Sequence, residues 1–225
     1  KPVLWQPVQE LTLLPNQVSL TLQNREVHVR VWLYEIIGAT GFPLPVYFLD
    51  TDFDDNHPDD RKLSWHLYGG DQLYRLCQEM VLGVGGLRML RDMGYKNIET
   101  FHMNEGHAGF LTLELMREQG YYDLEKIKDQ VIFTTHTPVP AGHDFFRFDL
   151  VDKVISQDAL YNLKRMLPNA DGVSMTELGI NFSHYVNAVS KKHAEVSRNM
   201  FSMPGIDWVT NGVHPGTWVS SGMKR

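Results

Sequence analysis

The most constraining feature of the sequence is a short run of apolar and β-branched residues, Val131-Ile132-Phe133-Thr134-Thr135. Such a run is typical of a strand that is buried on both faces of a parallel sheet. An earlier strand is predicted over 98–103, and a helix follows it from the candidate N-cap Asn104 to about Glu118. Strand, helix and strand at this spacing form a βαβ unit, so the sequence predicts an α/β fold with a parallel sheet.

The first quarter of the chain has a different pattern. Apolar and polar residues alternate over 18–22 and again over 27–31, which predicts a β-hairpin with one buried face. A further short strand is predicted over 46–49, after two prolines, and an acidic loop follows it. We therefore expect a β-hairpin extension over 17–50 within a single partial domain that covers 1–225.

Helical patterns are predicted on both sides of the βαβ unit. Apolar residues recur at helical spacing over 73–90, and Gly94 is the expected stop. Three glycines interrupt this stripe, and we expect them where the helix packs closely against a neighbour. A last long helix is predicted over 181–201, followed by a short strand over 208–210.

The composition excludes several classes of protein. Of the 225 residues, 43% are hydrophobic and 21% are charged, as in a globular chain and not a disordered one. A formal net charge of −6 argues against a nucleic-acid partner, because nucleic-acid binding needs clustered cations. No apolar run reaches the roughly 20 residues of a membrane span, and the single cysteine, Cys77, excludes an internal disulfide. We expect a cytoplasmic protein that does not act at a membrane.

Ligands of an open parallel sheet bind beyond the carboxyl ends of its strands, and three such ends carry polar residues here. The first end is followed by Glu105 and His107, which we expect in the first turn of the next helix. Free N–H groups and the positive end of the helix dipole face the crevice there. The two side chains are either a pair that orients a ligand or exchanges protons with it, or a capping arrangement.

The second strand end is the loop from Thr134 to Asp144, which contains two histidines, two prolines and a glycine. Pro138 holds Thr137 in an extended conformation, so we expect a stiff loop. A stiff loop at a strand end presents backbone carbonyls and a histidine such as His136 to a substrate, and we favour this over a purely structural connection. The third end, at Asn211, is by itself a turn signal.

Other polar residues have simpler interpretations. His102 and His107 are five residues apart, which is not the spacing of a helical zinc pair, and we expect no metal. Arg75 and Glu79 are four residues apart on a predicted helix and are interpreted as a surface ion pair. His193 falls on the apolar stripe of the last helix, so we expect a buried histidine with a hydrogen-bond partner.

Several long motifs in order resemble the α-glucan (glycogen/maltodextrin) phosphorylases, and most closely the shorter bacterial and archaeal branch of that family. The resemblance runs from about Val8 to about Trp218. Its motifs are Tyr68-Gly69-Gly70-Asp71-Gln72 with the following 74–79, then 102–107, 134–144, Val186-Asn187 with His193 and Glu195, and 210–214 with Trp218. The order of the motifs makes the resemblance specific, whereas no single motif would.

The resemblance implies phosphorolysis of α-1,4-glucans or maltooligosaccharides, in which a terminal glucose is transferred to phosphate to give glucose 1-phosphate. It implies one half of a two-domain GT-B glycosyltransferase fold, with a Rossmann-like parallel sheet flanked by helices. Pyridoxal phosphate would lie in the cleft between the halves, where its phosphate group assists proton transfer. A homo-oligomer is left open by the sequence.

The resemblance also implies roles for individual residues. His136, with Thr137 beside it, matches a histidine whose main-chain carbonyl faces the glucose. Asn211 matches an asparagine that hydrogen-bonds glucose hydroxyls, which replaces the turn interpretation. Glu105 stands where mammalian enzymes have an aspartate, and His107 matches a histidine nearby. Both are candidate catalytic residues, acting on the sugar directly or through the groups that touch it.

The stretch 65–70 matches a mobile gating loop, which places Tyr68 and Gly69 near the substrate.

Two parts of the family pattern have no counterpart in this chain. One is the glycine-rich loop that precedes the matched region in the family, and the other is the C-terminal half with the lysine that carries pyridoxal phosphate. We therefore predict that the 225 residues alone are inactive and that a C-terminal domain is their partner. The alternatives are a glucan synthase that uses a nucleotide sugar and a non-catalytic glucan-binding module.

Overall fold

The structure is a computed structural model that describes residues 7–67, 69–120 and 123–223. Its strands form a three-stranded antiparallel sheet (β1-β2-β3), a four-stranded parallel sheet (β4-β5-β8-β9) and a separate antiparallel pair (β6-β7). The strands are β1 (Thr12–Leu22), β2 (Arg25–Ile37), β3 (Pro43–Asp50), β4 (Phe101–Asn104), β5 (Val131–Thr135), β6 (Phe145–Arg147), β7 (Gly172–Ser174), β8 (Tyr185–Ala188) and β9 (Asp207–Trp208).

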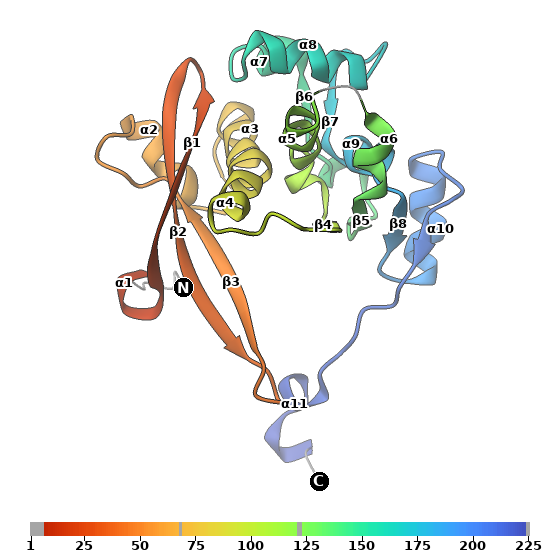
Figure 1. Ribbon diagram of the computed structural model, residues 1–225. Helices are drawn as coiled ribbons and strands as arrows, with labels where there is room; N and C mark the ends of the chain where they lie inside the picture. Colours follow the sequence, from red (N-terminus) through yellow and green to blue (C-terminus); the bar gives the residue numbers. More distant parts are fainter. Residues whose placement is uncertain (1–6, 68, 121–122, 224–225) are drawn as a thin grey trace.

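Helices α5, α6 and α9 lie on one side of the parallel sheet and α10 lies beside β8, and the helical run α3–α4 lies between the parallel and the antiparallel sheet (Figure 1). The α-helices are α1 (Pro7–Glu10), α2 (Pro58–Arg61), α3 (Gln72–Met80), α4 (Gly86–Asp92), α5 (Leu111–Glu118), α6 (Leu124–Asp129), α7 (Phe148–Val151), α8 (Gln157–Met166), α9 (Met175–Asn181), α10 (Lys191–Met200) and α11 (Pro215–Trp218). Single helical turns are η1 (Lys62–Ser64), the π-helical η2 (Val81–Gly85), η3 (Gly106–Ala108), η4 (Pro140–Gly142) and η5 (Ser221–Met223). In the described part of the chain, no helix has both the length and the apolar character needed to cross a membrane.

The predicted hairpin is present and is longer than the sequence indicates. Gln23 and Asn24 form its turn with φ values of 52° and 60°, and positive values at both positions match the twist of the flanking strands. The face predicted to be buried is buried, at Leu20, Leu22, Val27, Val29 and Val31. β3 contains both of the prolines expected to precede it, which an edge strand tolerates because its outer N–H groups need no partner.

The predicted helix over 73–90 is the run α3–η2–α4, in which a π-helical turn joins two α-helices. Asp71 begins it by accepting a hydrogen bond from the N–H of Tyr74 at 2.9 Å, and Gly94, with a φ of +93°, follows its end. A Cβ atom at Gly83 would lie 2.7 Å from the backbone nitrogen of Leu111 at the start of α5. The expectation that a glycine permits close packing is therefore confirmed at Gly83.

The parallel sheet confirms the predicted βαβ unit. β5 pairs with β4 on one side and with β8 on the other, so that Met103, Phe133 and Val186 lie side by side on one buried face. Helix α9 covers this face so closely that a Cβ atom at Gly179 would lie 2.6 Å from the ring of Phe133. The core of the domain lies between this face and the helices.

The prediction of one helix over 181–201 is wrong. The segment contains the end of α9, the strand β8 and the helix α10. Ser190 begins α10 because its hydroxyl accepts a hydrogen bond from the N–H of His193 at 3.1 Å. His193 is buried as predicted, and its Nδ1 accepts a hydrogen bond from the N–H of Val189 at 3.4 Å.

Two boundaries next to the predicted site also differ. Asn104 is not a helix cap but the last residue of β4, and α5 begins only at Leu111 after the turn η3. The cause is Glu105, whose φ of 65° turns the chain away from both strand and helix geometry. The last strand, β9 (Asp207–Trp208), begins one residue earlier and ends two residues earlier than predicted.

The packing of Gly83 gives a prediction for stability. Gly83→Ala should lower the free energy of unfolding by about 1–3 kcal/mol, because the new methyl group would meet the backbone at Phe110 and Leu111. Gly85→Ala is the matched control, since its nearest neighbour, a Leu20 methyl group, lies 3.8 Å away. Urea unfolding of both variants measures the difference. Equal stabilities would show that α5 does not constrain Gly83.

Candidate functional site

The candidate site lies at the carboxyl edge of the parallel sheet. β4, β5, β8 and β9 run in the same direction, so the segments after them emerge at one edge. Glu105 follows β4, His136 follows β5 and Asn211 lies three residues beyond β9. The structure therefore brings these predicted residues to one edge, which is where open α/β sheets bind ligands.

Glu105 fixes the start of the loop after β5. Its side chain is buried, and its Oε1 atom accepts hydrogen bonds from the backbone N–H of His136 and from the hydroxyl of Thr135, the latter at 3.4 Å. Its own N–H donates to the carbonyl of Thr134 at 2.9 Å. Glu105 has a φ of 65° and a ψ of 176°, a backbone conformation that costs a residue with a side chain about 1–3 kcal/mol, and these contacts offset part of the cost. Glu105 is thus placed to position the main chain of His136, not to face a ligand.

His143 closes the same loop onto α9. Its Nε2 lies 3.1 Å from the carbonyl oxygen of Thr137, and its Nδ1 lies 2.8 Å from the hydroxyl of Thr176. Because a carbonyl only accepts, Nε2 carries the proton, and Nδ1 accepts from Thr176. The ring also packs edge-on against Phe201, with centroids 5.1 Å apart. These contacts anchor the loop, and its stiffness stays a prediction from its prolines. The buried Nε2 of His136 has no hydrogen-bond partner in the described part of the chain.

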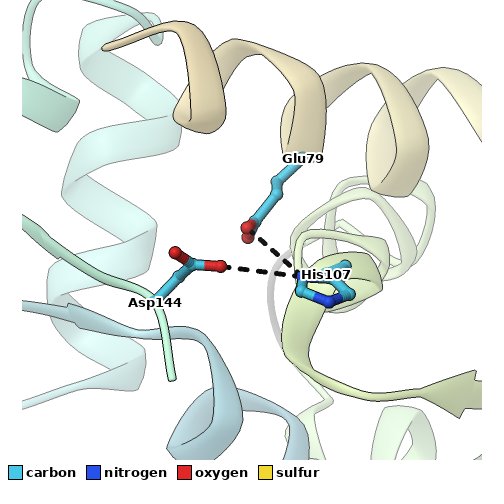
Figure 2. A group of neighbouring side chains, drawn as sticks. All are labelled: Glu79, His107 and Asp144. Carbon is cyan, nitrogen blue, oxygen red and sulfur yellow. Dashed lines mark ion pairs between the residues drawn. The ribbon is translucent and has the colours of Figure 1, made fainter. Parts of the chain in front are cut away.

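His107 makes no contact with Glu105 among those found and instead faces Glu79 and Asp144 in a cluster of charged groups (Figure 2). Its Nδ1 is 3.6 Å from a carboxylate oxygen of Glu79 in α3 and 3.6 Å from one of Asp144 at the end of the loop. Arg75 donates to both carboxylates, at 3.4 Å to Glu79. The interpretation of Arg75 and Glu79 as a surface pair is wrong, because the Glu79 side chain is only 5% exposed.

The cluster shifts the pKa values of its members in different directions. Hydrogen bonding to Asp144, and then to Glu79, raises the pKa of His107 to about 9. Burial raises the pKa of the Glu79 carboxyl to about 7. The hydrogen bond from His107 holds the pKa of Asp144 well below its usual range. Near neutral pH the network therefore joins the Asp144 carboxylate, the His107 imidazolium and the Arg75 guanidinium around a Glu79 carboxyl group that burial drives toward its protonated form.

The same cluster has the donor atoms of a metal site. One ligand atom from each of Glu79, His107 and Asp144 lies within 4.8 Å of the others. Arg75, however, already bonds to both carboxylates and supplies the positive charge that a metal would bring. We interpret the cluster as an ion-pair network, and the absence of a metal stays a prediction.

The remaining predicted residues are less tightly held. The N–H of Asn211 donates to the carbonyl of Val189 at 3.2 Å, which ties the segment after β9 to the end of β8. Asn211 is exposed. Among the described residues, its side chain makes no hydrogen bond to Thr137 or His136. Gly69 is exposed, and Tyr68 lies outside the described residues.

The predicted gating stretch lies beside the charged cluster. Trp65, His66 and Leu67 line a cavity of about 460 Å³ together with Arg75, Glu79 and His107. The structure therefore brings this stretch close to His107. The residues that line this cavity include none from the loop after β5. Gly69 and Tyr68 stay predictions as substrate-binding residues.

Sequence reasoning missed Glu79 and Asp144 as members of the site. Glu79 follows the buried Leu76 by three residues and precedes the buried Gly83 by four, so helical spacing places it on the buried stripe. The burial of Glu79 could therefore have been predicted from the sequence. Asp144 lies in the loop that was singled out, but nothing in its neighbours indicates a partner 69 residues away in Arg75.

Comparison with known proteins places the chain in a family. The family of the starch synthase catalytic domain matches residues 6–212. Maltodextrin phosphorylase of Thermococcus litoralis is 35% identical over 97% of this chain and 28% of its own length. Glycogen phosphorylase of Mycobacterium tuberculosis is 35% identical over 92% of this chain, and that of Aquifex aeolicus is 31% identical over 91%. These matches cover 27% and 32% of the two relatives, so the chain spans about three-tenths of the curated relatives it matches.

Removing the Glu105 carboxylate tests its positioning role. Glu105→Ala leaves the N–H of His136 without its acceptor, so we expect a loss of about 1–3 kcal/mol in the free energy of unfolding. Faster hydrogen exchange at the His136 amide should accompany the loss. Glu99→Ala, at an exposed position before β4, is the control. Unchanged exchange at His136 would contradict the role.

The charged cluster predicts a pH dependence of stability. The folded pKa of His107, about 9, exceeds its ordinary value of 6.5, so its contribution is complete below pH 6.5 and is lost as the pH rises through 9. Between pH 7 and 9.5 the free energy of unfolding should fall by about 1 kcal/mol, a value reduced because the ring is partly exposed. His107→Gln should abolish this fall.

Nuclear magnetic resonance titration of the His107 ring checks the cause. Asp144→Asn should lower the pKa of the ring, because Asp144 makes the largest contribution to the shift. A ring pKa of 6.5 or below in the unmodified protein would contradict the network.

Proposed function

The chain belongs to the family of the starch synthase catalytic domain, as a relative of the α-glucan phosphorylases, and we propose that it forms part of an enzyme that phosphorolyses α-1,4-glucans. A terminal glucose of a glucan or maltooligosaccharide would be transferred to phosphate, and glucose 1-phosphate would be released. The observation that carries the proposal is the stiff loop that Glu105 and His143 hold at the carboxyl edge of the sheet.

The loop supports this chemistry because glucosyl transfer develops positive charge on the sugar. A fixed carbonyl dipole near that charge stabilises the transition state without reorganisation. The main-chain carbonyl of His136 is our candidate for this role, with Glu105 holding the preceding N–H in place. Asn211 and Thr137 are candidates for hydrogen bonds to the sugar hydroxyls.

His107 has a different proposed role. Its bonds to Glu79 and Asp144 hold the far end of the loop against α3, so it acts through Asp144 on the position of the loop. Tyr68 and Gly69, in the gating stretch, are proposed to approach the substrate. Each of these assignments is a proposal for the complete enzyme, because the chain spans about three-tenths of its relatives.

The resemblance implies pyridoxal phosphate for the complete enzyme, and three lysines of this chain already have other partners. Lys192 pairs with Glu195, Lys62 pairs with Asp59, and Lys191 lies over the ring of Trp208. These contacts give no cradle for a phosphate group at the loop after β5. We assign no step to the cofactor in this chain and propose that its lysine lies in polypeptide outside the 225 residues.

A second candidate function is synthesis of a glucan from a nucleotide sugar. The match to the starch synthase catalytic domain favours it, since that family name describes such an enzyme. A glucan-binding module without catalysis is the candidate from a different class. The three candidates differ in their small-molecule product: glucose 1-phosphate, a nucleoside diphosphate, or none.

The test uses the complete polypeptide that the gene encodes in its source organism. With maltooligosaccharide and phosphate, we expect glucose 1-phosphate, and Asn211→Ala should lower kcat/KM roughly tenfold, which corresponds to about 1.4 kcal/mol. Asn97→Ala, at an exposed position before β4, is the matched control. Release of a nucleoside diphosphate from a nucleotide sugar, or binding without turnover, would overturn phosphorolysis.

A further inference from the structure

A buried histidine stands in the first turn of α10. His193 is the third residue of this helix and is 7% exposed. Its N–H donates to the hydroxyl of Ser190 at 3.1 Å, and its ring Nδ1 accepts from the N–H of Val189 at 3.4 Å. The side chain therefore reaches back to the residue before the N-cap, in a variant of the capping box.

The bond to Val189 decides which ring nitrogen carries the proton. Because the backbone N–H donates, Nδ1 must accept, and the neutral ring carries its proton on Nε2. Nε2 is buried and has no hydrogen-bond partner among the residues that the structure describes. A buried ring whose one such bond goes to a backbone N–H is placed to hold the chain and not to face a ligand.

Val189 passes this restraint on to Asn211. Its N–H is held by His193, and its carbonyl accepts a hydrogen bond from the N–H of Asn211 at 3.2 Å. β8 ends at Ala188 and α10 begins at Lys191, so Val189 lies in neither element. Contacts such as the one with His193 must therefore fix its backbone.

The pairing beyond β8 shows that the sheet does not fix the Val189 carbonyl. The N–H of Val209 donates to the carbonyl of Ala188 at 2.9 Å, and two residues later the N–H of Asn211 donates to that of Val189. In a regular parallel pair both strands advance by two residues between such bonds, because the bonds are evenly spaced. Here the segment after β8 advances by only one, so the ladder is irregular where Asn211 is held.

The same helix also holds the other end of the segment that carries Asn211. Nε of Arg198 donates to the carbonyl of Ile206 at 2.7 Å, directly before β9. The segment 206–211 is thus tied to α10 through Arg198 at its start and through His193 and Val189 at its end. Asn211 is exposed at the carboxyl edge of the sheet, next to the second of these ties.

We propose that His193 is a positioning residue for glucan binding, which acts through Val189 on the main chain of Asn211. The proposal rests on the proposed function, in which Asn211 hydrogen-bonds the glucose hydroxyls. Without the ring, the Val189 carbonyl can turn and the Asn211 amide loses its acceptor. A displaced Asn211 lowers the rate although no group that touches the sugar has changed, because transfer depends on the position of the bound sugar.

A double-mutant cycle in the complete polypeptide from the source organism tests this link. With maltooligosaccharide and phosphate, His193→Ala should lower kcat/KM for glucose 1-phosphate formation roughly fivefold, the effect of one lost hydrogen bond. In an Asn211→Ala background the same substitution should change kcat/KM by less than about twofold, because both residues act in one chain of contacts. An equal loss in the two backgrounds would show that His193 supports the fold alone and would overturn the proposal.

A conservative variant separates the hydrogen bond from the bulk of the ring. The amide oxygen of His193→Asn can stand near the position of Nδ1 and accept from the N–H of Val189, so we expect this variant to restore most of the lost activity. Asn199→Ala, at an exposed position on the same helix, is the control and should leave kcat/KM unchanged. If His193→Asn were no more active than His193→Ala, the bond to Val189 would have no part in positioning.

Hydrogen exchange followed by mass spectrometry gives a readout that does not depend on activity. In His193→Ala the amides of 209–211 should exchange faster by roughly fivefold, whereas Asn199→Ala should leave them unchanged. Unchanged exchange in His193→Ala would overturn the proposal. Absence of glucose 1-phosphate with the unmodified polypeptide would instead overturn phosphorolysis, so the two failures are distinguishable.

Discussion

The burial of Glu79 is the constraint on which the arrangement of the site depends. An unpaired buried carboxylate is costly, and its partners must come from several parts of the chain. Arg75 comes from the same helix, whereas His107 comes from the turn after β4 and Asp144 from the end of the loop after β5. The ion pairs of one oxygen of this buried acid, Oε1, therefore link three elements, while its buried Oε2 has no hydrogen-bond partner among the described residues.

The loop after β5 is held at both ends as a result. Glu105 binds its first N–H, at His136, and Arg75 binds its last side chain, at Asp144. Between these points, His143 joins the carbonyl of Thr137 to α9. A loop held in this way loses little entropy when a ligand binds, which is the physical basis of a preorganised site.

Local patterns in the sequence predicted the elements whose stability is local. The run at 131–135 is apolar enough to define a buried strand, and the alternation around Gln23 and Asn24 defines a hairpin whose turn needs no distant contact. The close packing at Gly83 was also readable, because a glycine on an apolar helical stripe leaves room for a neighbouring backbone to approach. The carboxyl edge as the place of the candidate site followed from the βαβ pattern alone.

Two of the failures have a common physical cause. Phe182, Val186 and Val189 fit a helical spacing, yet Tyr185–Ala188 becomes a strand because β5 offers a free edge there. That edge is a tertiary contact and leaves no mark on the segment itself. The same holds for Glu105, whose positive φ follows from the position of His136, 31 residues away. The surface interpretation of Glu79 failed differently, since its helical position was readable and its partners were not.

The two faces of the parallel sheet are unequal in polarity. Met103, Phe133 and Val186 fill one face, whereas the other face carries a hydrogen-bonded series. In this series His102 Nε2 lies 2.7 Å from the hydroxyl of Thr134, which donates to Asn187 at 2.9 Å. Parallel sheets are normally covered on both faces. The polar groups bond to one another and tolerate partial solvation. This face is therefore satisfied internally, with Thr134 and Asn187 buried and His102 exposed at its margin.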